Sequence, residues 1–485
     1  MSGLVAKSWE THPLELIGGL EHTRVRESIM RLPNRNRWIG AAVLTVTATF
    51  ASQDTATAQA SFASSADVED VTYAADVADI IQNNCTVCHR PGGIGPMDLV
   101  TYEDARRYAR RIREQVANKL MPPYYYDDDI GIQELDHDWR LSEEDIAMVV
   151  AWVDQGAALG DPADMPPPPD LVGTDDWSLA STLGQPDVVV PSAPIDVPAF
   201  GNDLWHRPFA EVGISEDRCI AALQVKPAGD AKGVVHHANS TFQLLQDDGS
   251  FEGSGDRATE YAMGKLGELI PDGVCRTLPA DAWVRWDIHM YPGGLGAAAA
   301  NDVLEDNVVE LGIWLHPKDY EYEYKQDLAL YGIREGELVM RPHGTAMTQG
   351  YRSFDHPVRI DSFQPHGHLR LRSASLEVFY PETGRTEVIS MVSNWSATWH
   401  QSHIYSSDVA PLIPAGAVLV MKQWYDNTAG NPNNPDPDQW VDGGSRTADE
   451  MSHAWIAVTH LDEEGYEELV EEREAAEERR ITQQD

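Results

Sequence analysis

Cysteine, basic side chains and long apolar runs are all scarce in this chain of 485 residues. Lysine and arginine number 36 against 78 aspartates and glutamates, which leaves a net charge of −42 at pH 7. A surface this acidic repels phosphate, so nucleic-acid binding and adsorption to anionic membranes are disfavoured. With 42% hydrophobic and 8% aromatic residues the chain can still form ordinary globular cores, and its length suits two or three domains.

One apolar run, residues 38–51, has the features of an export signal. It follows a basic stretch with Arg31, Arg35 and Arg37, and it precedes a small-residue sequence at 58–60 that is typical of a cleavage site. The run is too short to span a bilayer comfortably, although an uncleaved N-terminal anchor is the alternative. We expect translation to start at Met30 and residues 1–60 to be absent from the mature protein. That protein would be periplasmic or secreted, from a bacterium, with no membrane span.

Two of the four cysteines form a haem-attachment motif, since residues 85–89 read Cys-Thr-Val-Cys-His. The thiols of Cys85 and Cys88 can each add to a haem vinyl group, and the imidazole of His89 then lies under the iron. A zinc site would need two further ligands at matching spacing, and a thioredoxin-like motif would not need the histidine. We therefore predict covalent haem c. The other pair, Cys219 and Cys275, is expected to form a disulfide, because an exported chain meets an oxidising compartment.

Residues 73–160 have a helical pattern that suits a small haem domain. A short apolar face precedes the haem motif, residues 101–119 predict a basic amphipathic helix, and Ser142 begins a third helix. Two helices packed across each other around a haem make a small all-α cytochrome c fold, which we place at 61–164. The prolines that follow predict a stiff linker at 165–170.

The haem iron also needs a second axial ligand, for which Met121 is the best candidate. A thioether raises the haem potential, and the two prolines after Met121 stiffen the loop that must hold it. Met97 is a competitor, although it follows His89 closely in the sequence. Met148 is expected to be a core residue of its helix, and His137 remains an alternative.

Beyond the linker, apolar and polar residues alternate in short runs that are separated by turn residues. Examples are the runs 283–290, 308–315, 376–380, 387–392 and 417–424. The pattern predicts an all-β region large enough for two sandwiches. We place the first at 171–345 and the second at 346–462. The charged residues 463–485 are expected to form a solvated helix or a frayed tail.

The first β region contains three histidines in positions that packing does not require. His236 and His237 are adjacent, so both can reach one metal only at a strand end or at a β-bulge. His289 lies on the polar face of the run 283–290, whose other face is apolar and expected to be core. The three residues are therefore candidate ligands of one metal.

The second β region has a comparable group. His366 and His368 form an i, i+2 pair that is expected on one face of a strand, and Met451 begins another alternating run. Imidazoles with one thioether suit copper that cycles between Cu(II) and Cu(I) better than they suit zinc or magnesium, because sulfur favours Cu(I). The roles of His400 and His403 stay open: they could be donors behind the ligands, a substrate-contacting pair, or surface residues.

In this order, the groups resemble those of the copper type II, ascorbate-dependent monooxygenases, the family of peptidylglycine α-hydroxylating monooxygenase and dopamine β-monooxygenase. The resemblance covers roughly residues 200–462 and implies two jelly-roll-like sandwiches. It also implies that a copper on the first sandwich relays electrons to a copper on the second, across an open cleft, where O₂ binds and a substrate C–H bond is attacked. The matching stretches are Val235-His236-His237-Ala238, Ile288-His289-Met290-Tyr291, Pro365-His366-Gly367-His368 and Ala448-Asp449-Glu450-Met451. The ligands implied are His236, His237 and His289 for the first copper, and His366, His368 and Met451 for the second.

The chain departs from the mammalian peptide-hydroxylating members where they bind substrate. Their arginine two residues before the His-x-His pair is Gln364 here. Their asparagine and tyrosine beyond the methionine correspond to His453 and Trp455. These three residues are candidate substrate contacts, and a peptide substrate is not implied.

We therefore predict an exported haem–copper monooxygenase that hydroxylates a small organic substrate with O₂ and contains covalent haem c and two copper ions. The haem would relay electrons from a redox protein or an ascorbate-like reductant. The alternative is a non-catalytic electron-transfer or copper-binding component of a larger periplasmic assembly.

Overall fold

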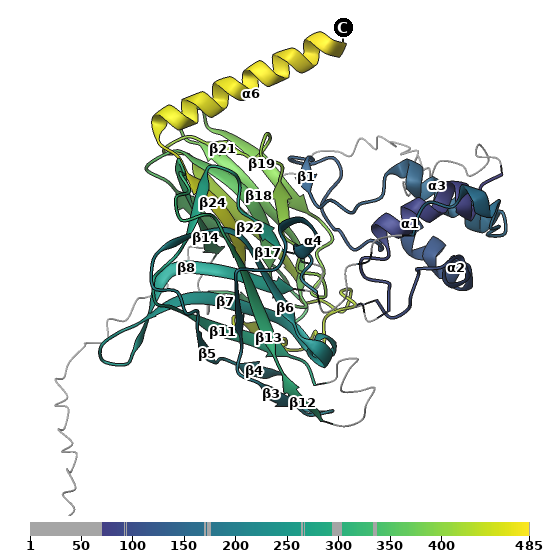
Figure 1. Ribbon diagram of the computed structural model, residues 1–485, viewed down its shortest axis with the longest axis horizontal. Helices are drawn as coiled ribbons and strands as arrows, with labels where there is room; N and C mark the ends of the chain where they lie inside the picture. Colours follow the sequence, from purple (N-terminus) through teal and green to yellow (C-terminus); the bar gives the residue numbers. More distant parts are fainter. Residues whose placement is uncertain are drawn as a thin grey trace, which may run out of the picture. The chain divides into compact units, whose positions relative to one another are not determined.

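A computed structural model describes residues 70–484, apart from 92, 94, 169–170, 172–175, 263–264, 266, 293–302 and 333–336. This part of the chain is mostly β-structure, with a few helices before the strands and one helix after them (Figure 1). The expected export signal and its cleavage site lie outside the described residues. Among the helices described, none is both long and apolar enough to cross a membrane.

The helices before the strands follow the predicted pattern and have a core of their own. A π-helical turn, η2 (Tyr73–Val77), and α1 (Ala78–Asn84) precede the haem motif, and α2 (Tyr102–Ala117) and α3 (Glu143–Asp154) follow it. Both α2 and α3 begin with a capping box, which satisfies backbone N–H groups that have no partner within the helix. Their shared core includes Tyr73, Ile81, Ile112, Val149 and Trp152. Shorter elements are η3 (Pro162–Asp164), α4 (Ala180–Leu183) and η4 (Gly229–Gly233).

The connection between α2 and α3 is not helical, in contrast to the pattern expected across 73–160. Tyr124, Tyr126 and Leu135 are buried in a β core whose other buried members come from residues 338 to 458. The Tyr126 hydroxyl lies 3.1 Å from the carbonyl oxygen of Ile389. β1 (Leu135–Asp136) pairs with β20 (His403–Tyr405) of the same core. Three consecutive tyrosines at 124–126 favour this packing. Burial of a large aromatic ring against a sheet contributes more free energy than its exposure on a solvated helix.

The first β core collects apolar side chains from Val190 to Ile313. Within it, β4, β5, β7, β8 and β11 form one sheet, and β2, β6 and β13 pair in the facing one. On β11, Val284, Trp286 and Ile288 are fully buried, which confirms the apolar face predicted for the run 283–290. The strands are β2 (Val188–Pro191), β3 (Ile195–Val197), β4 (Leu204–His206), β5 (Phe209–Glu211), β6 (Arg218–Pro227), β7 (Val235–Leu245), β8 (Phe251–Ala262), β9 (Glu268–Leu269), β10 (Val274–Leu278), β11 (Ala282–Met290), β12 (Leu304–Asn307) and β13 (Val309–Leu315).

The second β core is built in the same way. One sheet has the order β16-β22-β18-β19, and it faces β17, β24 and β14. The predicted runs 376–380 and 387–392 lie on strands β18 and β19, which pair antiparallel. The strands are β14 (Tyr324–Gly332), β15 (Val339–Met340), β16 (Thr345–Ser353), β17 (Val358–His366), β18 (Leu371–Tyr380), β19 (Arg385–Val392), β20 (His403–Tyr405), β21 (Leu412–Ile413), β22 (Val418–Asp426), β23 (Val441–Asp442) and β24 (His453–His460).

One sheet runs through both cores, which the expected boundary at residue 345 did not anticipate. β14 pairs antiparallel with β24 of the second core and parallel with β10 of the first. The β-sandwich architecture is therefore observed, but the two sandwiches share backbone hydrogen bonds. β8 of the separate five-stranded sheet contacts β14 of the shared sheet, and His237 on β7 lies beside His366 at the end of β17. After the last strand, α6 (Glu463–Gln484) confirms a helix at the charged tail.

The expected disulfide between Cys219 and Cys275 is present and links β6 to β10. Because 56 residues separate the two cysteines, the bond removes many conformations from the unfolded chain. The double substitution C219A/C275A should therefore lower the free energy of unfolding by about 2–4 kcal/mol. Urea unfolding followed by tryptophan fluorescence measures this loss, and an unchanged midpoint would contradict it.

Candidate metal centre

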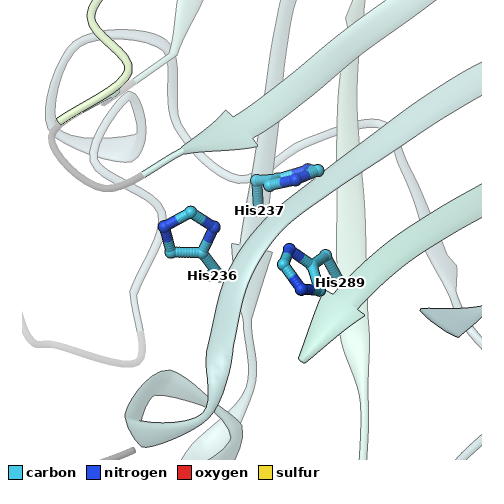
Figure 2. Close-up of side chains that lie close together, drawn as sticks. All are labelled: His236, His237 and His289. Atoms are coloured by element: carbon cyan, nitrogen blue, oxygen red, sulfur yellow. The ribbon is translucent and has the colours of Figure 1, made fainter. Parts of the chain in front are cut away.

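The first histidine group lies where β7 begins and β11 ends. His289 pairs with His237 while Met290 pairs with Val235, so His236 is the extra residue of a β-bulge. A bulge lets two adjacent side chains point to the same side of a sheet, so that both can bind one metal. Figure 2 shows the three imidazoles gathered around one point. One ring nitrogen of each lies within 4.8 Å of the other two.

Neighbouring side chains orient the His289 ring. Trp205 on β4 stacks on it with ring centroids 4.4 Å apart and the planes nearly parallel. A carboxylate oxygen of Asp203 lies 3.1 Å from its Nε2 and also accepts a hydrogen bond from the Thr447 hydroxyl. Neither ring nitrogen of His289 makes a hydrogen bond, although Nε2 lies beside the Asp203 carboxylate. The ring is therefore held by an aromatic face and a carboxylate, and it keeps a nitrogen for a metal.

The second group is arranged differently from the strand expected around it. β17 ends at His366 and β18 begins only at Leu371, so His368 lies in the connection and not on a strand. Gly367 makes this turn possible, because a Cβ atom there would come within 2.6 Å of the Leu371 side chain. The rings of His366 and His368 are 5.7 Å apart. The Nδ1 atom of His368 is 3.1 Å from the Asp449 carbonyl, which leaves its Nε2 for another partner.

Glu450 holds the loop of His368 and the segment of Met451 together. Its side chain is fully buried, and its carboxylate accepts hydrogen bonds from the backbone N–H groups of His368, Arg370 and Met451. Burial raises its pKa to about 7. This explains why a glutamate precedes Met451, since it fixes two segments that are distant in the sequence.

The two histidine groups are in contact, whereas the resemblance implies sites that face each other across an open cleft. The rings of His237 and His366 are 5.8 Å apart. His400 lies between the groups, with its ring centroid 5.5 Å from that of His236 and 4.8 Å from that of His366. The shared sheet brings the strand ends close enough for this contact.

Two residues of this centre were not predicted as ligands. Glu260 on β8, together with His366 and His400, forms a second set of three possible ligand atoms that all lie within 4.8 Å of one another. The sequence around Glu260 carries no metal-binding spacing, so nothing there identifies it. For His400, a role behind the ligands or at the substrate had remained open, and the structure places it inside the cluster. His403 lies outside it, with its ring packed on Tyr124 and Tyr126.

Burial keeps these imidazoles neutral at pH 7, which is the form that binds a metal. Desolvation lowers the pKa of His236 and of His368 to about 4. The pKa values of His237, His366 and His400 fall well below the usual range, for the same cause and because the neighbouring histidines would repel a proton.

A cavity of about 670 Å³ opens beside the cluster, with walls from both β cores. His237, His366, His368 and Met451 all line it, so members of both predicted ligand groups reach one space. Other residues of its wall include Trp205, Arg257, Arg285, His453 and Trp455.

Two of the three expected substrate contacts line this cavity, and the third does not. His453 and Trp455 line the cavity, and the Arg257 guanidinium lies over the Trp455 ring at 3.5 Å from its centroid. Gln364, in contrast, is 1% exposed and is not among the lining residues. Its amide donates to Glu260 and lies 3.4 Å from the Lys265 ammonium. Gln364 therefore contacts Glu260 and does not line this cavity.

The haem motif forms a turn directly after α1. The thiols of Cys85 and Cys88 are not joined in a disulfide, and the backbone N–H of His89 donates to the Cys85 carbonyl. The Nδ1 atom of His89 lies 3.0 Å from the Met97 carbonyl oxygen, which leaves Nε2 to bind an iron. Gly95 passes so close to this ring that a Cβ atom there would lie 2.6 Å from Nδ1. The motif thus fits a c-type haem.

The candidates for the second axial ligand differ in position. Met121 lines a separate cavity of about 510 Å³, together with Val116 and Ile146, and His89 is not among its described lining residues. Met97 and Met148 pack against the helical core, and His137 is exposed. The assignment of Met121 therefore stays a prediction.

Comparisons with known proteins give no closer identification. No family model and no curated protein matches the chain. Among solved structures, the chain is similar to the major capsid protein P2 from bacteriophage PM2, with 7% identity and a TM-score of 0.25 over 57% of this chain and 98% of that chain. It is also similar to PNGF-II, with 8% identity and a TM-score of 0.24 over 56% of this chain and 65% of that one. These scores are too low to support a functional argument.

Proposed function

We propose that the protein is an exported haem–copper monooxygenase that hydroxylates a C–H bond of a small organic molecule. One observation carries the proposal: two groups of buried histidines, in the order found in copper type II monooxygenases, meet in the wall of one cavity. The net reaction takes R–H, O₂, two electrons and two protons to R–OH and water. The haem motif upstream of the cavity offers a place for a one-electron donor.

The donor atoms support copper. The Nδ1 atoms of His236, His237, His289 and His366 are buried without a hydrogen-bond partner, and leaving so many polar atoms unsatisfied is costly unless they bind something. Imidazole nitrogens and the Met451 thioether on the same cavity wall suit copper in both of its oxidation states. When bound there, copper would supply one-electron redox chemistry and the activation of O₂.

The chain's own residues would position the substrate and the ligands. Glu450 fixes His368 and Met451 in one place, and Trp205 fixes the plane of the His289 ring. Trp455 and Arg257 form a flat wall with a positive charge above it, on the side of the cavity that carries His453. A small molecule held on this wall would lie beside His366 and Met451, away from bulk water.

Haem binding and export are parts of the same proposal. Free thiols at Cys85 and Cys88 and the orientation of His89 support covalent haem c in a cytochrome c-like helical segment. The disulfide between Cys219 and Cys275 supports an oxidising compartment, in agreement with a periplasmic or secreted location.

The mature protein should contain one covalent haem and two coppers per chain, and it should consume O₂ in the presence of a reductant and a substrate. Metal analysis by mass spectrometry gives the copper content, and the haem should remain with the protein during acid–acetone extraction. Zinc alone, or haem that is extracted, would contradict the proposal. Full copper and haem content without O₂ consumption across a panel of small aliphatic and aromatic substrates would favour the non-catalytic electron carrier instead.

A further inference from the structure

We propose that Glu260 and His400 are additional metal ligands that join the two histidine groups into a single dinuclear centre. The inference deepens the proposed function and rests on it, because the two metals would be those of the same site. It departs from the resemblance, which implies two separate mononuclear sites and assigns no ligand role to either residue.

His400 is a buried histidine that lies between the two groups. Its side chain is 3% exposed, and both of its ring nitrogens are buried without a hydrogen-bond partner. A buried imidazole normally uses at least one nitrogen in a hydrogen bond, and the backbone of Ala397 lies near this ring without making a well-formed one. At least one nitrogen of His400 is therefore available to a metal. Its centroid lies 5.5 Å from that of His236, 5.9 Å from that of His237 and 4.8 Å from that of His366. His400 therefore touches both groups.

Glu260, on β8, is a buried carboxylate that also lies close to both groups. Its side chain is 4% exposed, and its Oε1 has no hydrogen-bond partner. This oxygen lies 3.8 Å from Nδ1 of His237 in the first group. A carboxylate oxygen of Glu260 also lies within 4.8 Å of ligand atoms of His366 and His400. A carboxylate in this position can bind either metal or bridge both.

The residues behind Glu260 hold it in place. Its other oxygen accepts a hydrogen bond from the Gln364 amide, and Gln364 in turn contacts the Lys265 ammonium at 3.4 Å. Lys265 is paired with Glu268 at 2.9 Å, and Glu268 with Arg276 at 3.0 Å. All four of these side chains are buried. Support of this kind behind a ligand orients it and is typical of metal sites.

The chemistry of the set favours a pair of divalent transition metals. His236, His237 and His289 provide three nitrogens, and His366, His400 and Glu260 provide two nitrogens and one oxygen. Cu(II) binds imidazole and carboxylate donors, and metals that share a carboxylate lie roughly 3.5–4 Å apart. His368 and Met451 line the same cavity as His366, where they could bind a ligand or the second metal.

Electron paramagnetic resonance of the Cu(II)-loaded full chain tests the inference without any activity measurement. Two Cu(II) ions in a shared ligand shell couple magnetically, so the wild-type protein should bind two coppers and yet show much less than two spins of integrated Cu(II) signal. The spectra are recorded under conditions in which the haem signal is broadened away, and copper content is measured on the same samples.

Two variants and a matched control assign the ligands. His400→Ala and Glu260→Gln should each weaken binding of the second copper by at least about 100-fold, measured by competition with a chelator of known affinity. The one copper that remains should give an electron paramagnetic resonance signal that integrates to one full spin, because it has no second copper to couple with. Glu260→Gln keeps the size of the side chain, so it tests the ligand even if His400→Ala is unstable. His403→Gln changes a histidine of equal burial outside the cluster and should leave copper binding and coupling unchanged.

Three other outcomes would overturn the inference in distinguishable ways. Two coppers with two full, uncoupled spins would refute the dinuclear centre and leave the proposed function standing. Loss of the second copper in His368→Ala and Met451→Ala, with none in His400→Ala or Glu260→Gln, would assign that metal to the ligands implied by the resemblance. Failure of the wild-type protein to bind copper at all would overturn the proposed function together with the inference.

Discussion

The metal-free protein should lose on the order of 10 kcal/mol of stability when the pH falls from about 6.5 to about 5, and metal should prevent most of the loss. The cause is the number of histidines that are buried as neutral rings. The pKa of His236 and of His368 is lowered to about 4, and that of His403 and of His453 to about 3, in each case chiefly by burial. His237, His366 and His400 are lowered still more strongly.

The sign of the effect follows from where each state takes up protons. In the unfolded chain these histidines protonate near pH 6.5, but in the folded protein they stay neutral to pH 4 or below. Their contribution to stability is therefore complete above the unfolded pKa and is lost as the pH falls toward the folded pKa. Each such residue costs about 1.4 kcal/mol per pH unit within this window.

Two buried carboxyl groups act in the opposite direction. Burial raises the pKa of Glu260 and of Glu450 to about 7, so they bind protons in the folded state before they do so in the unfolded one. Their contribution is present below the unfolded pKa near 4.5 and is lost as the pH rises through 7. Two carboxyl groups cannot offset seven histidines, so the net effect of acid is destabilising.

Urea midpoints of the metal-free and copper-loaded proteins, measured across this pH range, check the prediction. Copper binds the neutral rings of the cluster and should remove most of the decrease in the midpoint down to about pH 5, while His403 and His453, which are not ligands, still contribute to it. His403→Gln serves as a control, because it removes one buried histidine outside the cluster and should reduce the pH slope without affecting copper binding. A midpoint of the metal-free protein that does not change between pH 6.5 and 5 would contradict the account.

Much of this architecture can be predicted from the sequence, because local patterns specify it. The helix starts at Ser142 and Thr101 follow from capping boxes, and the buried face of β11 follows from strict alternation. The bulge at His236 is one of the two arrangements, a strand end or a bulge, that the sequence left open for two adjacent ligands. These features depend on residues that are close to one another in the chain.

The parts that escaped prediction depend on contacts between distant segments. Glu260 and His400 join the cluster only because β8 and the loop before β20 meet at the shared sheet, and no spacing in the sequence records that meeting. Gln364 was expected at the substrate because of its place before His366. Its burial against Glu260 results from the packing of the two cores.

His289→Ala should slow the reoxidation of prereduced haem by O₂ and substrate at least about 100-fold, because it removes a ligand of the metal nearest to the expected electron path. In the proposed function, that path runs from the haem to the copper held by His236, His237 and His289, and from there to the second metal.

Stopped-flow absorption of the reduced haem band measures this step directly. In the wild-type protein the haem should reoxidise when oxygen and substrate are mixed in, since hydroxylation needs two electrons that the substrate does not supply. His206→Ala is the matched control: His206 lies on β4 opposite Ile288, its ring is 2.9 Å from the Ala193 carbonyl, and it is not part of the cluster. Its reoxidation rate should equal that of the wild type. If His289→Ala reoxidises as fast as both, the electron does not pass through that metal, and the haem serves partner recognition or structure instead.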